Sequence, residues 1–366
     1  MSSTYGEHLK LSLFGQSHGP AIGMTLDGIP AGLSVDFEKL QHFLNRRSPG
    51  NTPWSSPRKE LDQPEFLSGI LDGFTCGAPI SAVIYNRNAD SKSYSTVSEC
   101  PRPGHADYTA HIKYGGFQNT AGGGHFSGRL TAPLCIAGGL CIQWLAAAGI
   151  RIGAHITQIG TATDCNFHDM MPELDQVGKH FPTLNPDAAI AMQSVIAEAK
   201  AHGDSIGGEI ECAITGLPAG IGEPMFGGVE SRIAQIIYGV PGVKSLSFGL
   251  GENYKTALGS SANDAYGVNG GSVILNSNNC GGILGGISAG TPVIFKVIIK
   301  PTPSISKEQH SVNLKTLSPQ VLSTTGRHDP CIAPRAVPVI EAAAAIAVYD
   351  LILGNTQTDR RKKSWT

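Results

Sequence analysis

Two long segments of the chain are hydrophobic at nearly every position, and they give the strongest pattern in the sequence. They span residues 132–150 and 338–353 and are rich in alanine. A helix that is apolar on all sides is buried, so we expect two core helices. We expect no apolar stretch of the chain to be long enough to span a bilayer.

Shorter segments show either helical or strand-like spacing of apolar residues. Residues 36–46 and 229–238 have apolar positions at helical spacing, which predicts helices, while the β-branched runs 206–214 and 292–300 predict strands. The two kinds of segment do not alternate strictly. The expected fold class is therefore α+β, with helices packed with antiparallel or mixed sheets.

Two stretches of the chain resemble each other and predict an internal repeat. HGPAIG at 18–23 is followed by GIPAG at 28–32, and HGDSIG at 202–207 is followed by GLPAG at 216–220. A predicted helix and a turn with proline and glycine come after each pair. Three matching features in the same order favour duplication over chance.

The repeat predicts two similar halves that fold as one unit. We expect a single domain over residues 1–354, with its halves at about 10–150 and about 195–354. The basic run 359–363 follows, and we expect 355–366 to form a disordered, solvated tail.

Composition and charge exclude several classes of protein. With 27 Lys+Arg against 29 Asp+Glu, the 366 residues carry a net charge of −2, which does not favour a nucleic acid or a membrane as partner. The eight cysteines include no CxxC pair, and no charged start precedes an apolar signal core. Reduced cysteines are typical of the cytosol, so we expect a soluble, cytoplasmic protein.

The stretch RPGHAD at 102–107 concentrates three ionisable groups in a chain of which only 15% is charged. Proline and glycine favour a turn, which would present Arg102, His105 and Asp107 from a loop. Two other interpretations remain open from these residues alone. One is a surface turn with a local ion pair. The other is a metal pair of His105 and Asp107, but the sequence offers no third or fourth ligand at a typical spacing, so we expect no metal site.

Residues 15–19, GQSHG, match the GxSxG pattern of serine hydrolases. That nucleophile elbow needs a strand before the serine and a helix directly after it, and Pro20 and Gly23 disfavour the helix. A glycine-flanked loop that offers Ser17 and His18 to a ligand is the stronger interpretation. A serine hydrolase acting through Ser17 remains the enzymatic alternative.

Several further loops combine glycine or proline with a cation. Residues 122–129, GGGHFSGR, lead into the first long helix, and N–H groups at a helix N-terminus suit an anion. Residues 281–288 are glycine-rich, and 300–304 join a lysine to two hydroxyl groups. The cations in such loops are Arg46, Arg47, Arg102, Arg129, Lys300 and Arg327. This pattern predicts a small ligand with several negative charges, bound by guanidinium forks.

Taken in chain order, the motifs resemble those of one known family. GxSHG, RRxPG, RPGHADY, GGG…SxRxT, GDSIGG, PAG, GGILGGIS, KPTxS and RHDP, spread over about residues 5–355, resemble chorismate synthase. The resemblance implies a β-α-β sandwich, a homotetramer and a catalytic role for the single domain. The implied reaction is the 1,4-elimination of phosphate from 5-enolpyruvylshikimate 3-phosphate to give chorismate, the last common step toward the aromatic amino acids.

The same resemblance implies a cofactor and partners. The family uses reduced FMN, although the reaction involves no net redox change. Either an external flavin reductase or the chain itself, with NADPH, would then supply the reduced flavin.

The resemblance also implies roles for individual residues. His18 would assist the departure of phosphate, His105 would lie beside the reduced flavin, and Asp329 would help to remove the ring proton. Substrate-binding residues would be Ser17, Arg47, Arg102, Arg129 and Arg327. FMN-binding residues would be His125, Phe126, Ser127, Tyr238, Gly239, Gly285, Lys300, Pro301, Thr302, Pro303, Ser304 and Arg327.

The chain departs from the family pattern at several positions. The departures are Gln16 for glutamate, Pro53 for a second arginine, His125 for arginine, Phe126 for serine, Leu130 for glutamate, and Tyr238-Gly239 for Asn-Ala. Arg58 is a candidate to compensate for Pro53. Because of these departures, a non-catalytic relative that binds an anion or a nucleotide is a third hypothesis.

Overall fold

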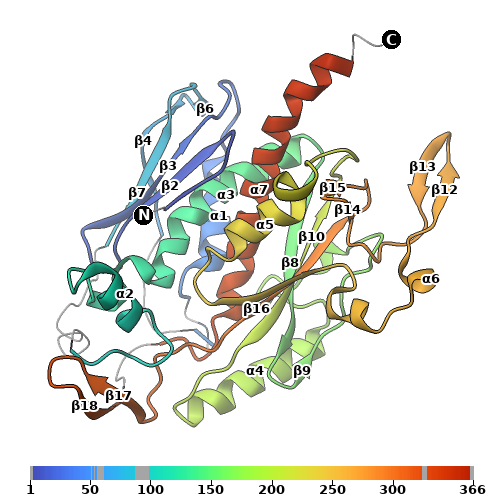
Figure 1. Ribbon diagram of the computed structural model, residues 1–366. Coiled ribbons are helices and arrows are strands. Elements are labelled where there is room, and N and C mark those ends of the chain that lie inside the picture. Colours follow the sequence, from blue (N-terminus) through green and yellow to red (C-terminus); the bar gives the residue numbers. More distant parts are fainter. Residues whose placement is uncertain are drawn as a thin grey trace.

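Two five-stranded antiparallel sheets lie on either side of long helices in the computed structural model, which describes residues 3–50, 52, 54–55, 62–86, 99–323 and 328–362, with side chains up to 355 (Figure 1). The first sheet has the order β1 (Thr4–Tyr5), β2 (Lys10–Gly15), β3 (Ala21–Asp27), β7 (Ile80–Tyr85) and β4 (Glu65–Ser68). The second has the order β11 (Val243–Phe248), β16 (Val293–Ile299), β10 (Gly208–Thr215), β8 (Arg151–Ile159) and β9 (Ala162–Thr163).

Four two-stranded hairpins complete the strands. They are β5–β6 (Ile70–Leu71, Phe74–Thr75), β12–β13 (Tyr266–Asn269, Ser272–Leu275), β14–β15 (Ile283–Leu284, Ile287–Ser288) and β17–β18 (Gln309–Asn313, Ser318–Leu322). The hairpin β12–β13 projects from the body of the molecule (Figure 1).

The helices form the middle layer of the fold and part of its rim. They are α1 (Phe37–Arg47), α2 (Asp107–Tyr114), α3 (Thr131–Ala147), α4 (Pro186–Ala201), α5 (Val229–Ile237), α6 (Gly259–Ala262) and α7 (Ala333–Lys362), with short 3-10 turns such as η2 (Ala121–Phe126) and η3 (Gly128–Leu130). Helix α3 packs on the first sheet, α7 packs on the second, and the two helices pack on each other. The expected β-α-β sandwich is confirmed.

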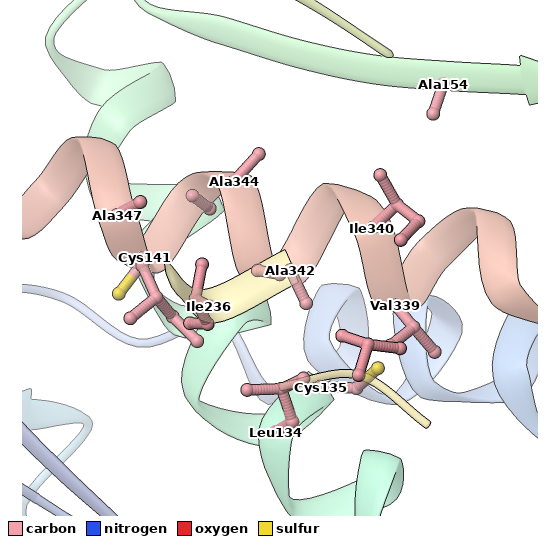
Figure 2. Packing of buried hydrophobic residues seen from close by; sticks show 14 of the residues in the cluster. Leu134, Cys135, Cys141, Ala154, Ile236, Val339, Ile340, Ala342, Ala344 and Ala347 are labelled. Atoms are coloured by element: carbon pink, nitrogen blue, oxygen red, sulfur yellow. The ribbon is translucent and has the colours of Figure 1, made fainter. Parts of the chain in front are cut away.

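The contact between α3 and α7 is unusually close because small residues face each other there. A Cβ atom added to Gly138 would lie 2.3 Å from the Cβ of Ala342, which no real pair of side chains tolerates. Figure 2 shows Val339 of α7 beside Cys135 of α3 in this core. Close approach of this kind explains the alanine and glycine in both helices.

Both core helices are long and apolar enough to cross a membrane, contrary to the expectation from the sequence. The segments Gly128–Ala147 and Ala333–Asn355 meet that criterion, but 78% and 89% of their most apolar windows are buried inside the fold. The prediction of two buried core helices is confirmed, and the statement about their length is wrong.

Most of the predicted elements are present, and the largest error concerns α7. Helices α1, α3 and α5 and strands β10 and β16 lie within three residues of the predicted bounds. Helix α7, however, begins five residues before Pro338 and continues to Lys362, into the segment expected to be a disordered tail. Gly354 does not end the helix, because one glycine costs only about 1 kcal/mol of helix propensity and removes no hydrogen bond.

A buried carboxylate on α7 fixes the N-terminal arm of the chain. Asp350 accepts hydrogen bonds from the backbone N–H groups of Glu7, His8 and Leu9 at 2.7–3.1 Å. The hydroxyl of Tyr5 donates to the carbonyl oxygen of Arg232 at 2.9 Å. These bonds tie the arm, including strand β1, to α7 and α5.

Candidate functional site

A cavity of about 860 Å³ lies where the end of α1, the segment before α3, the turn after α5, the loop 300–304 and the start of α7 meet. Its volume is within the usual range of ligand sites, about 300–1,000 Å³. Among the residues predicted from the sequence, those lining it are Ser17, Arg47, Arg102, His105, His125, Phe126, Ser127, Arg129, Tyr238, Gly239, Lys300, Pro301, Thr302, Pro303, Ser304 and Asp329.

Two of the predicted site residues that the structure describes, His18 and Gly285, are not in that lining. His18 lies directly behind it, with its Nδ1 3.1 Å from the hydroxyl oxygen of Ser17, which does line the cavity. Gly285 lies in the turn of the hairpin β14–β15 and lines no part of the cavity. Arg327 lies outside the described residues, as do Pro53 and Arg58.

The sequence predicted that the glycines at 122–124 form the N-terminus of α3, and this prediction is wrong. They form a turn that packs against two histidines. All three have positive φ, and η3 separates them from α3. A Cβ atom at Gly122 would lie 2.1 Å from the ring of His18, and one at Gly123 would lie 2.8 Å from the ring of His105. Glycine is therefore required because the backbone touches both imidazole rings.

The RPGHAD turn forms part of the cavity wall and is not a surface turn. Arg102 donates to the carboxylate of Asp107 through Nε at 2.8 Å and Nη2 at 2.9 Å, and His105 Nδ1 lies 2.8 Å from the same carboxylate. Both Arg102 and Asp107 are buried. Burial raises the pKa of Asp107, but the hydrogen bonds and charges of Arg102 and His105 together outweigh burial and hold that pKa well below its usual range. The expected local ion pair exists, and it orients the cation and the histidine.

Asp62, which the sequence analysis did not identify, pairs with two of the predicted arginines. Arg47 and Arg129 each donate through Nη1 to one oxygen of this fully buried carboxylate. The Ser48 hydroxyl donates to it at 2.8 Å. Burial raises the pKa of Asp62, but the nearby guanidinium groups outweigh burial and lower the pKa to about 2.

Asp329 and Arg335 form a further ion pair in the lining, at the start of α7. Arg335 also donates through Nε to the backbone carbonyl of Arg47 at 2.9 Å. Burial lowers the pKa of Arg335, against the opposing effect of Asp329. Arg335 thus connects the start of α7 to the end of α1. The sequence analysis did not identify Arg335 as a site residue.

The loop 300–304 contributes a cation and hydroxyl groups to the lining of the cavity. Lys300 donates through Nζ to the carbonyl oxygen of Gly104 at 2.5 Å, which ties this loop to the RPGHAD turn. Burial and the neighbouring Lys244 lower the pKa of Lys300. The hydroxyl oxygen of Thr302 is buried without a hydrogen-bond partner among the described residues. Such a loop suits the phosphate of a ligand.

Arg46 and His125 differ from the sequence expectations. Arg46 pairs with the buried carboxylate of Glu341 at 2.6 and 2.9 Å, so it has a structural role outside the cavity lining.

His125, which replaces an arginine of the family pattern, lies 2.8 Å from the carbonyl oxygen of Gly15 through Nδ1 and 2.7 Å from the hydroxyl of Ser3 through Nε2. His125 thereby joins the N-terminal arm to the cavity rim.

The surroundings of Ser17 differ from those of a hydrolase nucleophile. The serine follows β2 and precedes a turn and β3, so a hairpin stands where the elbow would need a helix. This geometry disfavours the serine hydrolase alternative.

Known proteins resemble this chain over nearly its whole length. A family model described as chorismate synthase matches residues 9–353. The chorismate synthase of Lancefieldella parvula is 44% identical over 367 residues, covering 96% of each chain, and that of Dehalococcoides mccartyi is 41% identical over 355 residues, covering 96% of this chain and 97% of the relative. A crystal structure of a chorismate synthase has a TM-score of 0.75 at 25% identity, covering 96% of this chain and 93% of the other.

Proposed function

Because the chain belongs to the chorismate synthase family, and is therefore a lyase, we propose that it converts 5-enolpyruvylshikimate 3-phosphate into chorismate and phosphate with bound reduced FMN. The observation that carries this proposal is the meeting of cations from distant segments in one cavity. The described cations in the lining are Arg47, Arg102, Arg129, Lys244, Lys300 and Arg335. The substrate has two carboxylates and a phosphate, which guanidinium and ammonium groups bind well.

The reaction needs one leaving group and one proton removed from opposite ends of an allylic system. The C–H bond breaks and its electron pair forms a new ring double bond, the existing ring double bond shifts by one position, and the C–O bond breaks with its electron pair leaving on the phosphate. These changes balance, so the product is neither oxidised nor reduced. When bound, reduced FMN supplies electron density to the allylic system during this exchange.

Three residues of the chain would handle protons in this reaction. His18, next to Ser17, would donate to the departing phosphate, and histidine suits this role because its pKa is near neutrality. Asp329 would accept the proton removed from the ring. His105, oriented by Asp107, would donate a hydrogen bond to an anionic flavin ring. Arg47, Arg102, Arg129 and Arg327 would hold the substrate anions.

Atoms in the cavity lining support the proposal that the protein binds FMN. The hydroxyl of Thr302, for which the described part of the chain offers no hydrogen-bond partner, would hold the phosphate of the cofactor together with Lys300 and Ser304. The other residues assigned to FMN are His125, Phe126, Ser127, Tyr238, Gly239, Pro301 and Pro303 in the lining, Gly285 outside it, and Arg327. A separate flavin reductase, or the chain itself with NADPH, would supply FMN in the reduced form.

We also propose that the protein is a cytoplasmic homotetramer. Exposed apolar side chains support association of subunits. Met225, Phe226, Val268 and Val273 are all more than two-thirds exposed, the latter two on the projecting hairpin β12–β13. Covering such residues with another subunit would remove apolar surface from water.

An anaerobic assay tests the proposed reaction directly. The purified protein, mixed with reduced FMN and 5-enolpyruvylshikimate 3-phosphate, is expected to release phosphate and form chorismate in equal amounts, and oxidised FMN is expected to support neither. Tight binding of FMN and substrate without phosphate release would contradict the proposal and favour a non-catalytic relative. Flavin-independent activity with fluorophosphonate labelling of Ser17 would favour the hydrolase.

A further inference from the structure

Asp62 is a fully buried carboxylate for which the proposed mechanism has no proton-transfer role. It lies between Arg47, the last residue of α1, and Arg129, in η3. Its backbone is held independently, because Gln41 donates through Nε2 to the main-chain oxygen of Asp62 at 3.2 Å. The carboxylate is therefore a fixed point at which the two guanidinium groups meet.

Arg47 and Arg129 reach the cavity with their guanidinium groups already oriented. Arg47 donates through Nε to the hydroxyl of Thr131 at 3.1 Å, and Arg129 donates through Nε to the side-chain oxygen of Asn86 at 3.4 Å. Both arginines are buried and line the cavity, whereas Asp62 does not line it. Two guanidinium groups that share one carboxylate would repel each other strongly in a buried site without it.

The charge of this group of three is compatible with anion binding. One carboxylate between two guanidinium groups leaves a net charge of +1, and the pKa of Asp62, lowered to about 2 chiefly by the arginines against the effect of burial, keeps the carboxylate ionised near neutral pH. The pair is thus held together and still attracts an anion.

We propose that Asp62 is a positioning residue, a fixed counter-ion that holds Arg47 and Arg129 side by side as one anion-binding pair. The inference deepens the proposed function, since the same pair would bind the substrate. Orienting charged groups before the ligand arrives lowers the cost of binding. Loss of Asp62 should therefore weaken substrate binding more than it slows the chemical step.

The first test compares Asp62→Asn with the wild type in steady-state kinetics. The amide keeps the shape of the side chain and removes its charge. We expect KM for 5-enolpyruvylshikimate 3-phosphate to rise at least about tenfold, the scale of a misplaced binding group, with kcat changed less than about threefold. Glu211→Gln is the matched control, because Glu211 is also a buried carboxylate but pairs with His155 away from the cavity. An unchanged KM, or a lower kcat at unchanged KM, would overturn the proposal.

The second test needs no turnover, so it remains informative if the proposed reaction is wrong. Inorganic phosphate can replace the missing counter-ion, so it should raise the Tm of Asp62→Asn by several degrees more than that of the wild type or of Glu211→Gln. The double variant Asp62→Asn/Arg129→Gln keeps the net charge of the group at +1 and should be more stable than Asp62→Asn alone. Equal phosphate shifts, or a double variant no more stable or unable to fold, would contradict the counter-ion role.

Discussion

His105 is restricted on two sides, by the carboxylate of Asp107 and by the backbone of Gly123. Replacement of Gly123 by alanine would place a methyl group 2.8 Å from the imidazole ring and put alanine at φ 90°. We expect Gly123→Ala to lower kcat/KM at least about tenfold, because the ring must shift. Gly259→Ala is the control, since a Cβ there meets nothing within 4 Å. Equal activity of the two variants would refute the contact.

His105 and Asp329 are the residues to which the proposed chemistry assigns the flavin contact and the ring proton. His105→Ala and Asp329→Ala should each lower kcat at least about a hundredfold, the usual effect of removing a positioned acid or base. The measurement is steady-state phosphate release under anaerobic conditions. Rates within a few-fold of the wild type in folded variants would show that these roles are wrong.

The depressed pKa of Asp62 predicts a pH-dependent stability. Its folded pKa of about 2 is below the ordinary 3.8, so its stabilising effect is complete above about pH 5 and is lost as the pH falls through 4 toward 2. The shift corresponds to about 2 kcal/mol in total. The difference in free energy of unfolding between wild type and Asp62→Asn should narrow by about 1 kcal/mol from pH 6 to pH 3. Urea denaturation measures it, and a difference that widens would contradict the assignment.

At the level of elements, the crossing of α3 and α7 depends on Gly138. A side chain there would collide with Ala342, so Gly138→Val should destabilise the fold by at least about 1–3 kcal/mol, the usual cost of overpacking. Ala146→Val, on the exposed end of α3, is the control and should change stability by less than about 0.5 kcal/mol. Similar denaturation midpoints for both variants would mean that the crossing is not tightly packed.

Helices and strands could be predicted where the local spacing of apolar residues determines them. They could not be predicted where contacts between residues distant in the sequence determine the structure. The spacing of apolar residues placed α1, α5 and β16 close to their observed bounds. The glycine run at 122–124 was wrongly predicted to form a helix N-terminus. Glycine is needed there because the backbone contacts His18 and His105, which are remote in the sequence. No local pattern indicates that a carboxylate 15 residues from Arg47 and 67 from Arg129 joins them.

At the level of the whole molecule, the internal repeat makes a geometric prediction. Strands β3 and β10 lie between the HG and PAG stretches of the two similar motifs. Both occupy the centre of a five-stranded antiparallel sheet, and both precede a helix, α1 or α5. If the halves arose by duplication, residues 18–50 should superpose on 202–242 with β3 on β10 and α1 on α5. Superposition that aligns the strands but not the helices would contradict the repeat.

The sequence predicted many of the site residues, but it did not predict the ion pairs that connect them. Motifs named most of the charged residues in the lining, since glycine and proline mark the loops that carry them. Asp62, Arg335 and Lys244 escaped because single charged residues in ordinary surroundings give no local signal. The three-dimensional fold is what brings them to the others.

Co-crystallisation with FMN and 5-enolpyruvylshikimate 3-phosphate tests most directly whether the remote cations serve one anionic substrate beside a flavin. We predict both molecules in the 860 Å³ cavity, with the FMN phosphate at Lys300 and Thr302 and the substrate anions on Arg47 and Arg129. Ligands bound elsewhere on the protein, with this cavity filled only by solvent, would contradict the account.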